Sequence, residues 1–273
     1  MLFTELSAAK LKQQPTIELK EQPIEDMILV SADKLLVSFH EQKKLMLLES
    51  ESGKMVSEIA LQDEPMLICM TGNHHAAVTS KNSKINFIQV SANQLKLESS
   101  MKVGVAVFGI AVHQQNMVMS YGSYWMADGE PGVKIISKDG TEIHNLDNTT
   151  TGREVFNAPR WITTTSDGSI YVTDWGTHKI TRLDSSLTIL QTFSGDMLEF
   201  PLGIISLNNK QLLVCSGDTD SIVLIRPSTN SMTVLLEKQL GIERPASICF
   251  CKVQKKLYIS PSQGNSVVVY RLL

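Results

Sequence analysis

The sequence lacks the features that mark membrane-spanning chains and chains that bind polyanions. Its 25 Lys and Arg stand against 28 Asp and Glu, giving a formal net charge of -3, so no overall positive charge attracts a nucleic acid. The longest uncharged apolar stretch, Val103 to Val112, is about half of the roughly 20 residues that a transmembrane helix needs. The N-terminus has neither a basic leader nor the apolar core of a secretory signal. We therefore expect a globular chain that has no membrane partner.

Cysteine is also scarce, with Cys69, Cys215, Cys249 and Cys251 in the whole chain. They form no Cys-x-x-Cys pair and have no histidine at metal-ligand spacing, which argues against a zinc site. Free thiols are typical of a reducing compartment, so the predicted location is cytoplasmic. The sequence has no Gly-x-Ser-x-Gly elbow and no glycine loop that cradles phosphate. These absences predict a binding protein rather than an enzyme, with no metal and no cofactor.

An internal repeat organises the chain. A proline or its stand-in precedes a short apolar run six times, at spacings of 42, 42, 52, 42 and 44 residues, and a second apolar run follows 10 to 12 residues after each anchor. Short apolar runs at this period are typical of β-propeller blades, because helical repeats would show a period of 3.6 residues. The anchors are Pro23, Pro65, Val107, Pro159, Pro201 and Pro245.

Each repeat is predicted to hold four short strands. A third strand begins ten residues after the start of the second in five units, and a fourth strand follows in the first five units. The third unit differs by an eight-residue insertion, within residues 121–131. The sequence therefore predicts an all-β fold, a six-bladed β-propeller of four-stranded antiparallel blades that start near residues 23, 65, 107, 159, 201 and 245.

The sixth unit reaches Leu273 after only three strands. Residues Lys12 to Lys20 stand at the offset that a fourth strand takes before the later anchors. We predict that this N-terminal strand completes the last blade and closes the ring, which removes exposed sheet edges. Residues 12–273 are then expected to form a single monomeric propeller domain, and residues 1–11 a leader or linker remnant.

Blade four has the most regular motif. Its residues 168–183, GSIYVTDWGTHKITRL, resemble the NHL repeat, in which a Tyr-Val strand ends in aspartate and a short turn leads to His or Asn and a basic residue. Blades five and six have Ser216 and Pro261 in place of the aspartate. Propellers of this kind are similar to the C-terminal domains of tripartite-motif (TRIM) proteins.

The TRIM resemblance implies a function. In that family a RING, B-boxes and a coiled coil precede the propeller, and the propeller selects a protein for ubiquitination or binds structured RNA. The expected role is therefore the substrate-recognition or partner-recognition domain of a TRIM-type ubiquitin ligase. Four scattered cysteines cannot build RING or B-box zinc sites, so ligase activity and oligomerisation would belong to other segments.

Candidate partner-binding residues in blade three lie in the insertion. Tyr121, Tyr124 and Trp125 fall between its second and third strands, on the face where the innermost strands begin. Aromatic residues in long loops on a rigid scaffold are typical of recognition surfaces. The alternative is that Trp125 folds back and caps the blade.

Blade four supplies the other candidates, Arg153, Arg160, Trp175 and Lys179. An arginine among aromatic side chains can stack on a base, hold a phosphate or clamp a carboxylate. Trp161, next to Arg160, is expected to be a core residue of the innermost strand.

Asp174 and His178 invite a catalytic or metal interpretation, but they lie at the strand-turn-strand junction of the NHL-like motif. We expect their side chains to satisfy backbone groups of that turn.

Two other functions are compatible with the fold. RNA binding by the same face would need converging basic residues, because phosphate contacts dominate nucleic-acid affinity. A metal-dependent, lactonase-like hydrolase would need several oxygen ligands around an ion on the axis. The acids near the inner-strand starts, Glu64, Glu199 and Glu243, lack a matching Asn and Asp pattern. The basic residues near the relevant turns are Lys43, Lys44, Lys81, Lys84, Arg160 and Lys179.

Overall fold

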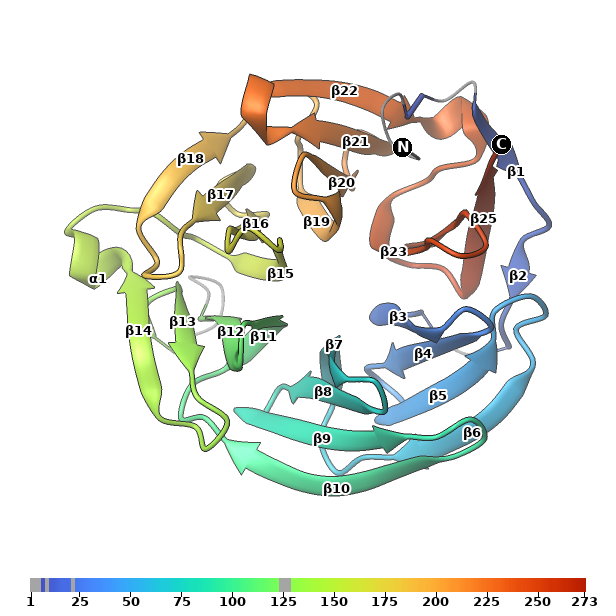
Figure 1. Cartoon of the computed structure of the whole chain (residues 1–273), viewed down its shortest axis with the longest axis horizontal. Helices are drawn as coiled ribbons and strands as arrows, with labels where there is room; N and C mark the ends of the chain where they lie inside the picture. The colour runs from blue at the N-terminus through green and yellow to red at the C-terminus, as the bar shows by residue number, and fades with distance from the viewer. Residues whose placement is uncertain (1–5, 8–9, 21–22, 123–128) are drawn as a thin grey trace.

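The computed structural model describes residues 6–7, 10–20, 23–122 and 129–273, and these form six blades around a central axis (Figure 1). Each blade is an antiparallel sheet, and in the first five blades the strands follow one another in the chain from the axis outward. The predicted all-β, six-bladed propeller of four-stranded blades is confirmed. Five of the six anchors are the first residues of innermost strands, and four of these five are prolines, which suit that position because proline lacks the N–H that an inner position of a sheet would use.

Blades one to three contain the first twelve ring strands. Blade one is built from β3 (Asp26–Ser31), β4 (Lys34–Phe39), β5 (Lys44–Glu49) and β6 (Met55–Ala60). Blade two is built from β7 (Pro65–Gly72), β8 (His75–Ser80), β9 (Lys84–Val90) and β10 (Leu95–Lys102). Blade three is built from β11 (Val107–His113), β12 (Asn116–Tyr121), β13 (Gly132–Ile136) and β14 (Glu142–Asp147).

Blades four to six complete the ring. Blade four follows helix α1 (Asn148–Thr151) and is built from β15 (Pro159–Thr164), β16 (Ile170–Asp174), β17 (Lys179–Leu183) and β18 (Ile189–Phe193). Blade five is built from β19 (Pro201–Asn208), β20 (Gln211–Ser216), β21 (Ser221–Arg226) and β22 (Ser231–Leu236). Blade six contains β23 (Pro245–Cys251), β24 (Lys256–Pro261) and β25 (Ser266–Leu272), and short 3-10 turns flank β22 at 227–229 and 238–240.

The N-terminal segment supplies the outer edge of blade six. Strands β1 (Leu11–Gln13) and β2 (Ile17–Glu18) both pair antiparallel with β25, and the N–H of Gln14 between them donates to the carbonyl of Val269 at 2.8 Å. The predicted closure of the ring by an N-terminal strand is confirmed, with the strand divided into two short segments. The first of these begins at Leu11, within the predicted leader.

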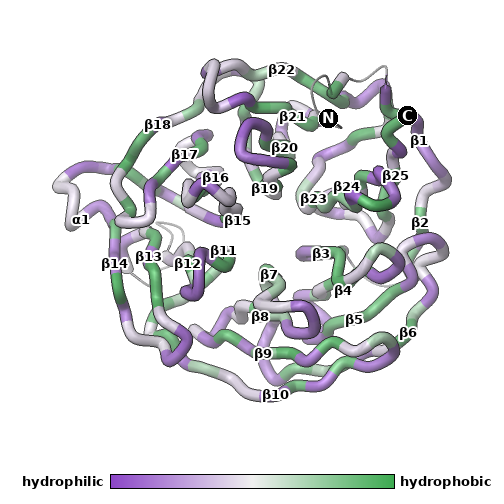
Figure 2. Tube along the Cα trace, in the orientation of Figure 1, coloured by the Kyte–Doolittle hydropathy of each residue, from purple (hydrophilic) through white to green (hydrophobic). Residues whose placement is uncertain are grey.

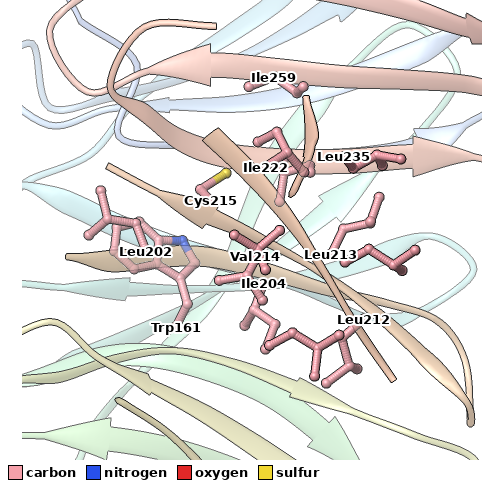
Figure 3. Packing of buried hydrophobic residues seen from close by; sticks show 14 of the residues in the cluster. Trp161, Leu202, Ile204, Leu212, Leu213, Val214, Cys215, Ile222, Leu235 and Ile259 are labelled. Atoms are coloured by element: carbon pink, nitrogen blue, oxygen red, sulfur yellow. The ribbon is translucent and has the colours of Figure 1, made fainter. Parts of the chain in front are cut away.

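Apolar side chains fill the spaces between neighbouring blades. Figure 3 shows one such cluster, in which Trp161 of blade four lies near Leu202 and Ile204 of blade five. The outer strands β6 and β10 face solvent and carry hydrophilic residues between hydrophobic ones (Figure 2). Because every blade buries both faces, the ring is rigid and the loops at its two ends are the parts that can differ without disturbing the core.

Buried hydroxyl groups link successive blades at one level of the ring. Ser38 of β4 donates to the carbonyl of Met66 in blade two at 2.8 Å. Thr79 of β8 donates to the carbonyl of Phe108 in blade three at 2.5 Å, and Ser120 of β12 donates to that of Arg160 in blade four at 2.7 Å. Each hydroxyl also accepts a backbone N–H of its own innermost strand. The hydroxyls therefore fix the height of one blade against the next.

Among the described residues, no helix has the length and apolar content that crossing a bilayer would require. All four cysteines are free thiols.

Candidate functional site

One end of the ring, which we call the entry face, is where the innermost strands begin and the second strands end. Backbone hydrogen bonds join the two kinds of segment. The N–H of Gly122 donates to the carbonyl of Ala106 at 3.1 Å, and that of Gly217 donates to Phe200 at 3.1 Å. Gly122, the first residue after β12, therefore lies beside the start of the innermost strand of its blade.

Arg160 stands at the centre of the entry face. It is the second residue of β15, and its Cζ lies 5.3 Å from the ring of Phe108 in blade three and 5.1 Å from the ring of Trp161. Its side chain is 19% exposed. An arginine held between two aromatic rings keeps its charge and its planar set of donors while most of its stem is dry.

The partner of Arg160 comes from the opposite side of the ring. Arg160 Nη2 forms an ion pair with Oε1 of Glu25, which precedes β3 in blade one, and the Glu25 side chain is 21% exposed. Blades one and four are three positions apart in a six-membered ring, so this pair spans the axis. It lies above a cavity of about 280 Å³ that residues from all six innermost strands line, among them Ile68, Ile110 and Ile248.

Trp161 follows Arg160 and lines the cavity beneath the ion pair. Its side chain is 8% exposed and packs between blades four and five, as expected for a core residue of the innermost strand (Figure 3). The indole Nε1 is buried and has no hydrogen-bond acceptor among the residues that the structure describes. The indole of Trp161 therefore keeps a buried donor unpaired within the described part of the chain.

Asp26 follows Glu25 and is fully buried. Its Oδ1 accepts from Ser247 Oγ of blade six at 2.7 Å, and its Oδ2 accepts from the N–H of Ile68 of blade two at 2.9 Å. Burial raises the pKa of Asp26 to about 6, against the opposing effect of these two hydrogen bonds. This carboxyl ties three blades together at the axis.

Asp174, the aspartate of the NHL-like motif, binds backbone groups around its turn. Asp174 accepts hydrogen bonds from the backbone N–H groups of four residues, at 2.7 to 3.0 Å, and burial raises its pKa. The donors are Asn157, Ala158, Gly176 and Thr177.

His178 joins blade four to blade five. Its Nδ1 accepts from the N–H of Phe200 at 3.0 Å. The Trp175 ring packs against the Phe200 ring, with centroids 4.8 Å apart. Both aromatic side chains are half-buried on the entry face, and Lys179 is exposed beside them.

Tyr121 is placed differently from the prediction that it contacts a partner. Its side chain is buried within blade three, donates to Asn145 Oδ1 at 2.6 Å and lies under Lys134, whose Nζ is 4.7 Å from the ring. The physical reason is the neighbouring Gly132, where a Cβ would be 2.6 Å from the Tyr121 hydroxyl. The missing side chain makes the room that the tyrosine fills.

Arg153, a further candidate, lies away from the centre of the entry face. Arg153 is exposed but follows α1, which lies at the outer rim of the ring (Figure 1). Tyr124 and Trp125 lie outside the described residues.

Four of the six basic residues considered for RNA binding form ion pairs with acids that the structure describes, among them Arg160 with Glu25. Lys84 Nζ lies 2.5 Å from Asp63, Lys43 lies 3.2 Å from Glu64, and Lys44 lies 3.2 Å from Glu58. These pairs reduce the positive potential that a phosphate backbone would meet. Within the part of the chain that the structure describes, no three His, Cys, Asp or Glu side chains group together in a way that could hold a metal ion.

Glu25 and Phe108 were not among the predicted site residues. Phe108 stands one position after its anchor, as Arg160 does, so the repeat register by itself places the two at one level of adjacent blades. No comparable signal marks Glu25, because it meets Arg160 across 135 residues and across the axis.

Comparisons with known proteins show the fold. No family model matches the chain, and no curated protein matches it. Solved structures do match, among them a streptogramin B lyase, at 12% identity and a TM-score of 0.67, with 98% of this chain and all of that one covered. A catalytically inactive virginiamycin B lyase from Staphylococcus aureus with quinupristin matches at 16% identity and a TM-score of 0.66, over 97% of this chain and all of that one.

A third structure comes from a different kind of protein. The β-propeller domain of Cps50 (Swd1) from Myceliophteria thermophila matches at 9% identity and a TM-score of 0.63, over 92% of this chain and 84% of that one. Proteins with such different names share this architecture, and identities this low carry the fold alone. The chain is therefore similar to these proteins in being a β-propeller.

Proposed function

We propose that this chain is a non-enzymatic binding propeller that recognises a protein partner through its entry face, around Arg160 and Trp175. The observation that carries the proposal is the grouping of Arg160, stacked on Phe108 and Trp161, with the half-buried Trp175–Phe200 pair on the same face. Tryptophan and arginine are the residues most enriched at interface hot spots. A rigid ring holds them with little ordering to be done on binding.

The narrower form of this proposal is a substrate-recognition domain of a cytoplasmic TRIM-type ubiquitin ligase. It is supported by the likeness of residues 168–183 to an NHL repeat and by the four free thiols. The hydrolase alternative has weaker support, since the two acids nearest the axis have other partners. Glu25 pairs with Arg160, and Asp26 accepts from Ser247 and Ile68.

The test is affinity capture from nuclease-treated cell extract with the purified chain, followed by quantitative mass spectrometry. Trp175→Ala and Arg160→Met are compared with Val253→Ala, because Val253 is 83% exposed in the β23–β24 turn at the opposite end of the ring. We expect a set of proteins retained by wild type and Val253→Ala to be lost from both entry-face variants. Equal capture by all four chains, with unchanged melting temperatures, would contradict the proposal.

A further inference from the structure

The Arg160–Glu25 pair has the geometry of a carboxylate-binding site that is already filled, rather than of a contact that only packs the core. Arg160 is fixed at its base, where its carbonyl accepts from Ser120, and at its head, where two aromatic rings hold the guanidinium. Glu25 reaches it from the opposite blade, and both side chains keep about a fifth of their surface exposed. Water and a partner can therefore approach the pair from the entry face.

We propose that the Arg160 guanidinium binds one carboxylate of the partner, from an Asp or Glu side chain or a chain terminus, and that Glu25 holds that place in the unbound chain. This inference rests on the proposed function, since it names the chemistry that the entry face recognises. Binding is then an exchange of one carboxylate for another. No buried charge is left unpaired on Arg160 in either state, and the displaced Glu25 turns into solvent.

The aromatic rings beside Arg160 support the exchange. The Trp161 ring lies 5.1 Å and the Phe108 ring 5.3 Å from Arg160 Cζ, so the guanidinium stays in place when its carboxylate partner changes. Glu25 pairs with one of its nitrogens, Nη2. A guanidinium has five N–H donors in a planar fork, so a partner carboxylate can bind it through two of them.

The charges around the site favour a carboxylate over a phosphate. Asp26 is one residue from Glu25, and the exposed Glu199 and Glu243 precede the innermost strands of blades five and six on the same face. A phosphate carries close to two negative charges and would be repelled more strongly by these acids than a single carboxylate is. The exchange of one carboxylate for another leaves the charge of the site unchanged.

The experiment measures binding to three arrays of ten-residue peptides that are randomised except for one central residue, which is Glu, Gln or phosphoserine. Wild type is compared with Glu25→Gln, Arg160→Met and the double variant. Glu64→Gln is the matched control, since Glu64 pairs with Lys43 at 3.2 Å on the same face. Glu25→Asp, which keeps the charge on a shorter stem, is the second variant at the site.

We expect Glu25→Gln to bind its preferred Glu peptides about tenfold more tightly than wild type, the gain that follows when an internal competitor holds the site about 90% of the time. Arg160→Met and the double variant should lose the preference for Glu over Gln peptides. Glu64→Gln should match wild type, and Glu25→Asp should lie between wild type and Glu25→Gln.

Three outcomes would overturn the inference. These are an unchanged preference in Glu25→Gln, tighter binding of peptides with phosphoserine at the central position, and no peptide bound by any folded variant. If Trp175→Ala abolishes protein capture while Glu25→Gln leaves it and the peptide preference unchanged, the proposed function stands and the carboxylate exchange fails. If capture is insensitive to every entry-face variant, both fail.

Discussion

At the scale of single residues, Asp26 makes the stability of the ring depend on pH. Burial raises its pKa to about 6 in the folded chain from 3.8. A carboxyl whose pKa is raised by folding stabilises the folded state below the unfolded pKa, and this contribution is lost as the pH rises through the folded pKa. The affected window therefore runs from about pH 4 to pH 6, and the neutral carboxyl is the favoured state below it.

We expect Asp26→Asn to remove this dependence. The stability of wild type relative to Asp26→Asn should fall by up to about 3 kcal/mol between pH 4 and pH 7.5, because each unit between the two pKa values is worth about 1.4 kcal/mol. Urea unfolding of both chains at the two pH values measures it. Parallel pH profiles for the two chains would show that Asp26 is not the group responsible.

Gly109 is the second residue on which the ring depends. A Cβ at this position would lie 1.8 Å from the carbonyl oxygen of Arg160, which is backbone and cannot move aside. Gly109→Ala should therefore push blades three and four apart and destabilise the chain by about 1 to 3 kcal/mol, the usual cost of overpacking. Gly72→Ala is the control, since nothing lies within 4 Å of its Cβ position. Similar unfolding midpoints for the two variants would refute this account.

At the scale of the elements, the second strands of blades one to three do more than pair with their neighbouring strands. Strands β4, β8 and β12 each send one hydroxyl to the next blade, from Ser38, Thr79 and Ser120. The acceptor carbonyl in each case belongs to the second residue of the innermost strand of the next blade. The same strand therefore fixes both its own sheet and the height of the adjacent one.

Removing one of these hydroxyls should weaken the contact between one pair of neighbouring blades. Ser120→Ala leaves the Arg160 carbonyl and the Gly109 N–H without their buried partner, so we expect a loss of about 1 to 3 kcal/mol. Amide exchange should accelerate in β11 and β15 more than in blades five and six. Ser99→Ala, at an exposed position of β10, should change neither quantity. An equal acceleration of amide exchange in all blades would argue against a local contact between blades three and four.

At the scale of the whole molecule, closure depends on five paired residues of the N-terminal segment. Strands β1 and β2 cover the outer edge of β25, and Ile17 and Leu19 are buried against blades one and six. A ring that is open at one edge exposes both a strand for pairing and part of its core.

A chain that lacks residues 1–20 should melt at a lower temperature and self-associate. A synthetic peptide of residues 10–20 should restore the melting temperature of that chain by binding β25, with a dependence on peptide concentration that mass action requires. The same peptide with Ile17 replaced by Asp is the control and should not restore it. Equal rescue by both peptides would mean that the segment does not act as the closing strand.

The blade count and the closing strand were predictable because they depend on short-range patterns. A strand of five to eight residues shows its apolar run locally, and the repeat multiplies that signal six times. Arg160 and Trp161 were also placed correctly, one at the entry face and one in the core, since both follow directly from the anchor Pro159. Tyr121 was assigned to the surface, because a residue at the end of a strand carries no local sign of which neighbour leaves room for it.

The sequence by itself determined the period, and with it the fold, the number of blades and the face on which each connection lies. Only the tertiary structure decided which side chains meet across the ring, as Glu25 meets Arg160, and which carboxyl is buried among three blades, as Asp26 is. The physical reason is that periodicity records the contacts within a blade, whereas closure of the ring brings together residues 135 positions apart whose pairing no repeat encodes.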